Sequence, residues 1–388
     1  MRALLWPLTL LVVLITGCAS QPASNTVTDT LASRPDAGSF EQFGKALAAS
    51  MAARDSTLFT RSLDTEQFAR RSLTSLGLAA VKKQAVASYA KSLQKIVDNR
   101  FGDTFSSVQY ADFLRLMPND TDQPDQAVAL IRIEPEDGGI SYWKVYLRRA
   151  NGKVTIVDWL NYALGEIASK AIGGFALNVG TIAQKPDSGG VAALKAYFAA
   201  VKGTDPQQLL QTYDQLPPGI RENSLLMYTY FQAANRISPA TYQTVLADLA
   251  PIYRKQDSYA LLMFEYHQVN GDYAEAHKSL DKTAVQLGED AGLDTLHAGL
   301  ALMTEDYKSA IAYARDGINR EPAFIKNYWV LLDALVFTEN YADAVLVLNI
   351  LEEGFGYQFD AEKLAGLEGY EAFGQSAPFN SWRVASSQ

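Results

Sequence analysis

Three short segments in the second half of the chain repeat one pattern at a fixed spacing. They read NGDYAEAH, TEDYKSAI and TENYADAV, and their tyrosines stand 34 residues apart each time, at Tyr273, Tyr307 and Tyr341. The residue three positions later is always alanine, at Ala276, Ala310 and Ala344. A regular period of this length indicates repeated structural units that bury their faces against neighbouring copies.

The spacing and the Tyr-x-x-Ala signature resemble the tetratricopeptide repeat, which is a unit of two helices. The resemblance implies that each tyrosine opens the second helix of its unit and that each alanine lets two helices approach closely. This resemblance implies an all-α solenoid over residues 190–360, followed by a capping helix and tail over 361–388. Asp272, Asp306 and Asn340 immediately precede the second helices, where their side chains are expected to cap free backbone N–H groups.

In the tetratricopeptide family, the first helices line a concave groove that holds a peptide or a partner helix. When the repeats are aligned with the family pattern, the groove positions correspond to Glu265, Gln268, Thr295, Leu302, Trp329, Asp333 and Val336. Each of these residues is expected either in the groove or in the core between repeats. The tail contributes Phe379 and Trp382, which either cap the array or contact a partner.

The N-terminal 20 residues, MRALLWPLTLLVVLITGCAS, combine one cationic residue with an apolar run that is too short to span a bilayer. The run ends in Ile-Thr-Gly-Cys, which resembles the lipobox of bacterial lipoproteins. That resemblance implies a signal peptide over residues 1–17 and fatty acids such as palmitate on Cys18. A flexible tether rich in Ser, Thr, Ala and Pro is expected over 18–38. Ala19 directs the lipoprotein to the outer membrane under the family's sorting rule, facing the periplasm.

The segment 39–183 changes from helical to strand periodicity along its length. Its first half has apolar residues at helical spacing, whereas 126–134, 140–149 and 153–160 are short and rich in β-formers, and 104–117 is a further candidate strand. Asn151-Gly152 between the last two strands predicts a tight hairpin turn. Helices followed by an antiparallel meander of strands predict an α+β domain with helices on one face of the sheet.

The closing sequence Ile-Val-Asp-Trp, 156–159, resembles a strand of the nuclear transport factor 2-like rolls, and more particularly of the periplasmic phospholipid-shuttle proteins. The resemblance implies an α+β roll, so the expected fold class is an α+β roll followed by an all-α tetratricopeptide solenoid. It also implies a conical cavity for a lipid or another hydrophobic ligand. Candidate lining residues are Tyr142, Val145, Tyr146, Ile156 and Trp159. Strand alternation predicts that Val145 and Tyr146 face opposite ways, as do Ile156 and Trp159. The inward residues either line a cavity or fill a plain core. Asp158 is expected to point away from that side, into solvent or as a candidate catalytic carboxylate.

Composition narrows the function classes. A net charge of −9 disfavours a nucleic-acid partner. A single cysteine excludes intramolecular disulfides and multi-cysteine metal sites. The spacings of His267, His277 and His297 match no metal-binding motif, and neither a catalytic set nor a cofactor motif is present. We therefore expect a non-enzymatic adaptor or scaffold for a protein partner in the cell envelope, anchored through Cys18 and without metal or cofactor. The alternative is a carrier of a hydrophobic ligand in the roll, and an enzyme with its site in that cavity is the third possibility.

Overall fold

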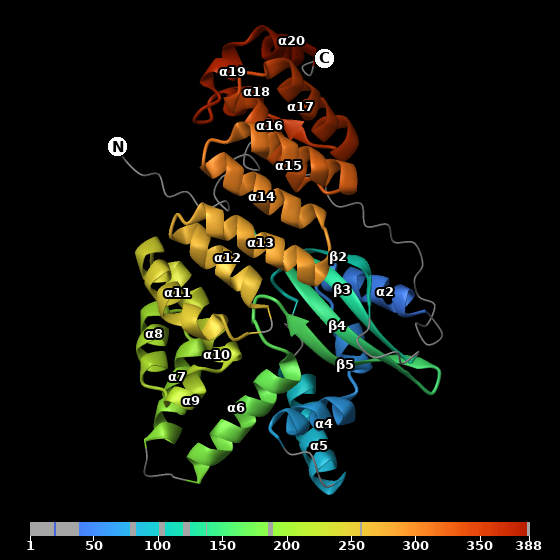
Figure 1. The fold of residues 1–388 in the computed structure, drawn as a ribbon, viewed down its shortest axis with the longest axis vertical. Coiled ribbons are helices and arrows are strands. Elements are labelled where there is room, and N and C mark those ends of the chain that lie inside the picture. The colour runs from blue at the N-terminus through green and yellow to red at the C-terminus, as the bar shows by residue number, and fades with distance from the viewer. Residues whose placement is uncertain are drawn as a thin grey trace. The chain divides into compact units, whose positions relative to one another are not determined.

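A computed structural model describes residues 19–20, 39–77, 83–100, 105–118, 125–136, 138–184, 189–256 and 258–385. The chain divides into two compact units (Figure 1). The sheet unit comprises Ser33–Glu136 and Ile140–Tyr266. The C-terminal unit comprises Met1–Ala32, Asp137–Gly139 and His267–Gln388. The expected signal peptide and Cys18 lie outside the described residues, as does most of the expected tether.

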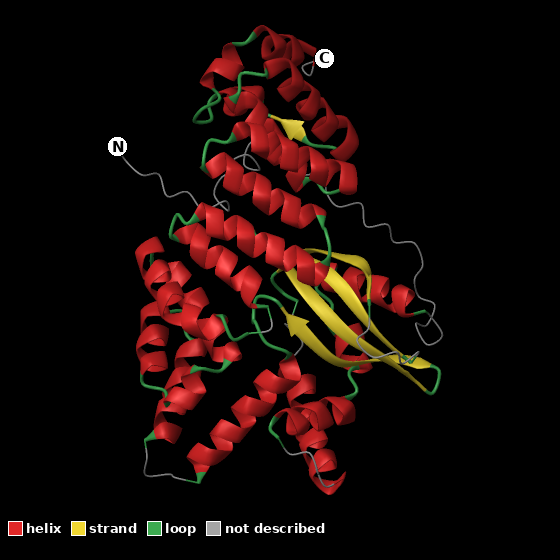
Figure 2. Ribbon diagram, in the orientation of Figure 1, coloured by secondary structure: helices red, strands yellow, loops and turns green. Residues whose placement is uncertain are grey.

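The sheet unit begins with four helices, α2 (Phe40–Ala52), α3 (Thr57–Ser62), α4 (Thr65–Ser75) and α5 (Lys83–Arg100). A capping box starts α2, because the Ser39 hydroxyl accepts from the Gln42 N–H while the Gln42 side chain accepts from the Ser39 N–H. Four antiparallel strands follow in sequential order, β2 (Val108–Met117), β3 (Gln126–Pro135), β4 (Ser141–Ala150) and β5 (Lys153–Asn161). An antiparallel sheet followed by an all-helical region confirms the coarse order predicted from the sequence (Figure 2).

The predicted hairpin turn lies between β4 and β5. Asn151 and Gly152 both have positive φ, 53° and 76°, as a type I′ turn requires, and Ala150 pairs with Lys153 across it.

Strict alternation fails along β5. The register slips between Tyr146 and Leu147 of β4, whose partners on β5 are Asp158 and Ile156, so that Val157 is an extra residue. The bulge turns Ile156 and Trp159 to the same side, where both are buried in one apolar core. The prediction that these two residues face opposite ways was therefore wrong, because it assumed an unbroken ladder.

Helices continue the sheet unit beyond the boundary expected near 183–190. They are α6 (Ala168–Ala183), α7 (Gly190–Lys202), α8 (Pro206–Asp214), α9 (Pro218–Arg221), α10 (Ser224–Ile237), α11 (Pro239–Tyr253) and most of α12 (Tyr259–Val269). Side-chain amides join them to α6: Asn223 donates to the Ala171 carbonyl at 2.8 Å, and Asn178 donates to the Gly219 carbonyl at 2.7 Å. These helices thus belong to one compact unit with the sheet.

The C-terminal unit contains the remaining helices. They are α13 (Tyr273–Leu287), α14 (Ala291–Met303), α15 (Tyr307–Arg320), α16 (Lys326–Phe337), α17 (Tyr341–Phe355), α18 (Ala361–Ala365), α19 (Glu371–Gln375) and α20 (Ala377–Ala385). The tail is thus largely helical, although its sequence has little periodicity. A two-residue strand, β6 (Gln358–Phe359), pairs antiparallel with β1 (Ala19–Ser20).

The sequence repeat corresponds to a repeated backbone turn. The signature tyrosines are the first residues of α13, α15 and α17, and the three signature alanines are fully buried. The residue two positions before each tyrosine has positive φ: 77° at Gly271, 58° at Glu305 and 57° at Glu339. In each copy the next N–H donates to a carbonyl five residues earlier, at 2.8–2.9 Å. The three turns are therefore equivalent in geometry as well as in sequence.

The expected side-chain helix cap is present at one of the three positions. Asp306 accepts from the Ser309 N–H at 3.1 Å, whereas Asp272 and Asn340 make no side-chain capping bond. Asn340 instead donates to the Asp343 carboxylate at 3.0 Å. The turn is therefore set by its repeated backbone geometry rather than by a shared cap.

Candidate functional site

Most of the residues expected to line a groove are buried. Thr295 on α14 and Trp329, Asp333 and Val336 on α16 are almost fully buried, whereas Glu265, Gln268 and Leu302 are half-buried. The described stretch from Ala291 to Ala301 is buried at every residue, and so is Asn327–Val336. Helices buried all round belong to a core. Of the two alternatives left open by the sequence, the structure places these four residues between helices.

A polar network around α14 explains the position of Thr295. Its hydroxyl donates to the Asn327 side-chain oxygen at 2.8 Å, and the Asn327 amide donates to the Ala291 carbonyl at 3.2 Å. Asn327 is completely buried and touches α15 where Gly317 leaves room: a Cβ on Gly317 would clash with the Asn327 amide. Thr295 and Asn327 therefore join α14 to α16 rather than face a ligand.

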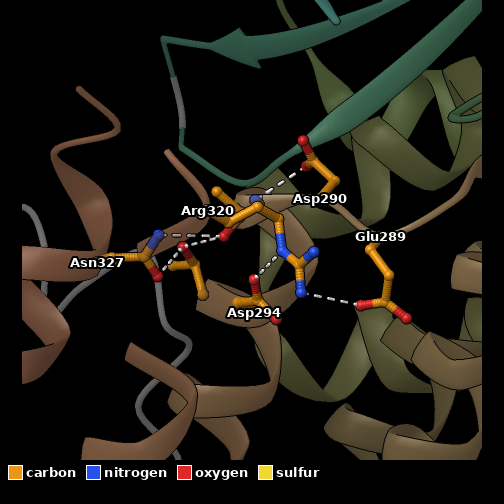
Figure 3. Close-up of polar contacts among 8 residues, drawn as sticks. Glu289, Asp290, Asp294, Arg320 and Asn327 are labelled. Atoms are coloured by element: carbon orange, nitrogen blue, oxygen red, sulfur yellow. Dashed lines mark hydrogen bonds and ion pairs between the residues drawn. The ribbon is translucent and has the colours of Figure 1, made fainter. Parts of the chain in front are cut away.

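Arg320 on α15 completes this network on its exposed side. Its Nε donates to Asp294 at 2.9 Å, and its Nη2 donates to Glu289 at 3.2 Å (Figure 3). Burial raises the pKa of Asp294 in spite of this pairing, and the hydrogen bond to Asp294 raises the pKa of Arg320. Asp290 accepts from the Gly292 N–H at 2.9 Å and caps α14. The arrangement ties the start of α14 to the end of α15.

The end of the chain covers α16. Trp329 packs edge-on against Tyr357 and Phe359, at centroid distances of 5.2 and 5.8 Å. Tyr370 donates its hydroxyl to the buried Asp333 carboxyl at 2.5 Å. Burial raises the pKa of Asp333 to about 7 and raises the pKa of Tyr370 well above its usual value. The aromatic side chains after residue 356 therefore occupy the side of α16 where the sequence predicted an open groove.

The tail aromatics take the capping position. Phe379 and Trp382 are buried in the same apolar cluster as α16 and α17, and the Trp382 indole donates to Glu352 at 3.0 Å. Phe379 and Trp382 therefore pack against the last long helices of the C-terminal unit, as in the capping alternative.

Two histidines that lie 20 residues apart in the sequence meet in the C-terminal unit. His277 on α13 and His297 on α14 approach to 2.7 Å between their Nδ1 atoms, and Tyr313 of α15 stacks on the His297 ring at 4.9 Å. Burial, and then the charge of His277, lower the pKa of His297 to about 4. The spacing fits antiparallel helices, which is the signal that could have revealed the pair. No group of three or more metal-ligating side chains was found among the described residues.

Three of the expected cavity residues fill the core of the sheet unit. Val145, Ile156 and Trp159 are buried, and Phe68 stacks on Trp159 at 5.1 Å. Phe59 meets the same indole edge-on, also at 5.1 Å. The interior side of the sheet is therefore packed by aromatic side chains, as in the plain-core alternative.

The two expected tyrosines lie differently. Tyr142 is fully buried and packs edge-on against Tyr162, at 6.3 Å between centroids. Tyr146 is half-buried, with the Arg71 guanidinium 5.7 Å from its ring centre. Neither residue belongs to the apolar core cluster that holds Val145, Ile156 and Trp159.

Asp158 is buried rather than exposed to solvent, which corrects one of the two sequence expectations for it. Its Oδ1 accepts from the backbone N–H groups of Trp159 at 3.0 Å and Ser169 at 3.1 Å, and Arg71 lies 3.6 Å from Oδ2. These partners favour the charged form, yet burial outweighs them and raises the pKa of Asp158. Because Ser169 is in the first turn of α6, this carboxylate satisfies a free donor at the start of that helix.

A pocket of about 470 Å³ lies elsewhere on the sheet unit. Phe43, Leu58 and Val154 form its apolar part, and Asp55, Thr57, Arg61, Ser62, Lys153 and Thr155 form its polar part. Asp55 accepts from the Thr57 N–H at 2.8 Å, and the hydrogen bonds from Thr57 lower the pKa of Asp55. None of the five expected cavity residues contributes to this pocket.

Comparisons with protein-family models, with curated proteins and with solved structures find no match. Among the described residues, no helix is both long and apolar enough to cross a membrane.

Proposed function

We propose that the chain is a lipid-anchored adaptor of the bacterial envelope that holds a protein partner through its repeat helices. The observation that carries the proposal is the threefold recurrence, at 34-residue spacing, of one helix–turn–helix geometry around Tyr273, Tyr307 and Tyr341. Arrays of this kind present long helix faces to other proteins. In this proposal the array is a divergent tetratricopeptide solenoid, and the chain catalyses no reaction of its own.

The lipobox supports the proposed location. Acyl chains on Cys18 hold the protein at the outer membrane, and Ala19 is the sorting residue that favours that membrane. Two or more acyl chains give stable anchoring, at about 0.8 kcal/mol for each buried CH₂ group. The body of the protein then faces the periplasm.

The outer face of α17 is the surface that best fits a protein partner. Leu346 and Ile350 lie one turn apart, with exposed fractions of 58% and 43%. Ala342, one turn before Leu346, is exposed as well. Residues four apart share one helix face, so these side chains form one apolar strip. Four expected groove residues are buried in the core: Thr295, Trp329, Asp333 and Val336. We therefore propose that the partner binds this strip rather than a concave groove.

A crosslinking experiment tests the adaptor. A photoreactive amino acid replaces Leu346 or Ile350 in the full-length protein, produced in the bacterium that encodes it, and Val285 on α13 is the matched control. Val285 is 88% exposed and stands apart from this strip. We expect one defined protein adduct from positions 346 and 350, which Leu346→Ser abolishes at position 350 without lowering the melting temperature. Equal adducts from position 285, or none from α17, would contradict the proposed surface.

The carrier alternative is not supported by the packing of the sheet unit. Three residues expected to line its cavity fill the aromatic core, and the pocket beside Phe43 and Val154 has an exposed, charged rim. We therefore propose the adaptor alone.

A further inference from the structure

Helix α7 has an exposed apolar face that the adaptor proposal does not use. Its inner side is held by Tyr197 and Ala200, which are buried, and Tyr197 packs against Tyr213 of α8 at 6.2 Å. The opposite side has exposed Phe198 and Val201, with exposed fractions of 41% and 39%. This helix is apolar on both sides, although one side is left in solvent.

Helical geometry gathers the exposed residues into one strip. At 100° per residue, Val191, Leu194 and Val201 all fall within about 60° of Phe198 around the helix axis. Val191 and Leu194 are half-buried, so the strip runs nearly the length of the helix. Phe175 of α6 extends it sideways, since its ring meets Phe198 edge-on at 6.1 Å.

Lysines border this strip on one side. Lys195 and Lys202 are exposed and fall within about 60° of Phe198 as well. Helices α6 and α7 contain no acidic residue, in a chain whose net charge is −9. The nearest acidic residues along the chain on either side of α7 are Asp187, which follows Lys185 and lies outside the described residues, and Asp205. Asp205 uses its carboxylate to accept from the N–H groups of Gln207 and Gln208, at 2.9 and 3.3 Å. The exposed side of α7 is therefore cationic and apolar, against the charge of the whole molecule.

This combination identifies the occupant by its chemistry. We infer that α7, with Phe175 of α6, docks onto the surface of a bilayer containing anionic phospholipids. Phe198 and Val201 enter the boundary between headgroups and acyl chains, and Lys195 and Lys202 pair with phosphate groups. The two lysines distinguish this surface from the outer strip of α17, where Leu346 and Ile350 have no lysine on their own helix. The inference does not depend on the acyl anchor, because the contact is made by α7 and α6.

Vesicle sedimentation tests the inference. The chain from Ala19 to Gln388 contains every described residue and lacks Cys18, so binding cannot come from an acyl group. The probes are vesicles of phosphatidylcholine alone and vesicles with phosphatidylglycerol at a ratio of about three to one. We expect binding to the anionic vesicles, weaker binding to the neutral ones, and a loss of binding at high salt.

Variants locate the contact. Lys195→Gln with Lys202→Gln should weaken binding about 25-fold, at about fivefold for each lysine. Phe198→Ser should weaken it about tenfold. Lys282→Gln and Val285→Ser on α13 are the matched controls, because both residues are exposed on a helix outside the docking face.

A variant that should keep its binding separates a lost contact from a misfolded protein. Phe198→Trp keeps an aromatic side chain at the same position and should bind at least as well as the wild type. The added indole should show an emission shift to shorter wavelength with anionic vesicles. Equal binding to neutral and anionic vesicles, or an unchanged emission spectrum, would overturn the inference. A dimer that Phe198→Ser converts to a monomer in sedimentation velocity would also overturn it, since the occupant would then be a second copy of the chain.

Discussion

Replacing Asp333 with asparagine should make the protein more stable at neutral and alkaline pH. The Asp333 carboxyl is buried on α16, and burial raises its pKa from 3.8 to about 7. Between these two pKa values the folded state keeps a proton that the unfolded state releases, so the free energy of unfolding falls progressively as the pH rises from 3.8 to about 7. Each pKa unit corresponds to about 1.36 kcal/mol, so the full cost above pH 7 is on the order of 4 kcal/mol.

An asparagine amide at this position would remove this cost while keeping an oxygen that accepts from the Tyr370 hydroxyl. We expect the Asp333→Asn variant to match the wild type near pH 3, below the unfolded pKa of 3.8, where the carboxyl is protonated in the folded state and largely so in the unfolded state. Its free energy of unfolding should exceed that of the wild type by about 2–4 kcal/mol near pH 8. The difference between the two proteins cancels the titration of all other groups.

The assay is urea unfolding at a series of pH values, with hydrogen exchange of the α16 amides to localise the effect. Tyr370→Phe is the companion variant. Because its hydroxyl donates to the carboxylate at 2.5 Å, its loss should destabilise the protein most above pH 7. A constant difference between Asp333→Asn and the wild type across this pH range would refute the reasoning, because it would mean that Asp333 has an ordinary pKa in the folded state.

Three further predictions address packing, backbone strain and anchoring. Gly317→Ala should cost about 1–3 kcal/mol of stability, because a Cβ there would clash with the buried Asn327 amide, and thermal unfolding measures this. Gly354→Ala is its control: the nearest atom would be an Ile350 carbon at 3.9 Å, so helix propensity should make this change stabilising by about 0.5 kcal/mol. Glu305→Gly should raise stability by up to about 1 kcal/mol, since Glu305 has a φ of 58° and the first repeat already has glycine there; an unchanged unfolding midpoint would count against strain at this turn. Cys18→Ala should abolish metabolic labelling by an alkyne fatty acid and release the protein from the outer-membrane fraction, whereas persistent labelling would exclude Cys18 as the acylated residue.

Local patterns were sufficient for much of the secondary structure. The helices that begin at Tyr273, Tyr307 and Tyr341 follow from a repeat visible in the sequence, and the Asn151-Gly152 turn follows from the residues that accept positive φ. These features depend on neighbours within a few residues along the chain. For the same reason the β5 bulge at Val157 escaped prediction, because a slip in register depends on the partner strand.

Whether the expected groove side of α16 is open or covered could not be predicted from the sequence. Register placed Trp329 and Asp333 on the groove side of a first helix, but Tyr357, Phe359 and Tyr370 cover that side from further along the chain. An apolar helix face can be covered by the protein itself or left for a partner, and the sequence of that helix is the same in both cases.

The sequence by itself therefore determined the repeat period, the helix starts, the hairpin and the expectation of an acylated Cys18. Only the tertiary structure decided which apolar faces are covered, which left the outer strip of α17 and the lysine-bordered strip of α7 exposed. The physical reason is that helix and turn formation depend on local backbone and side-chain chemistry, whereas burial depends on segments that meet only after folding.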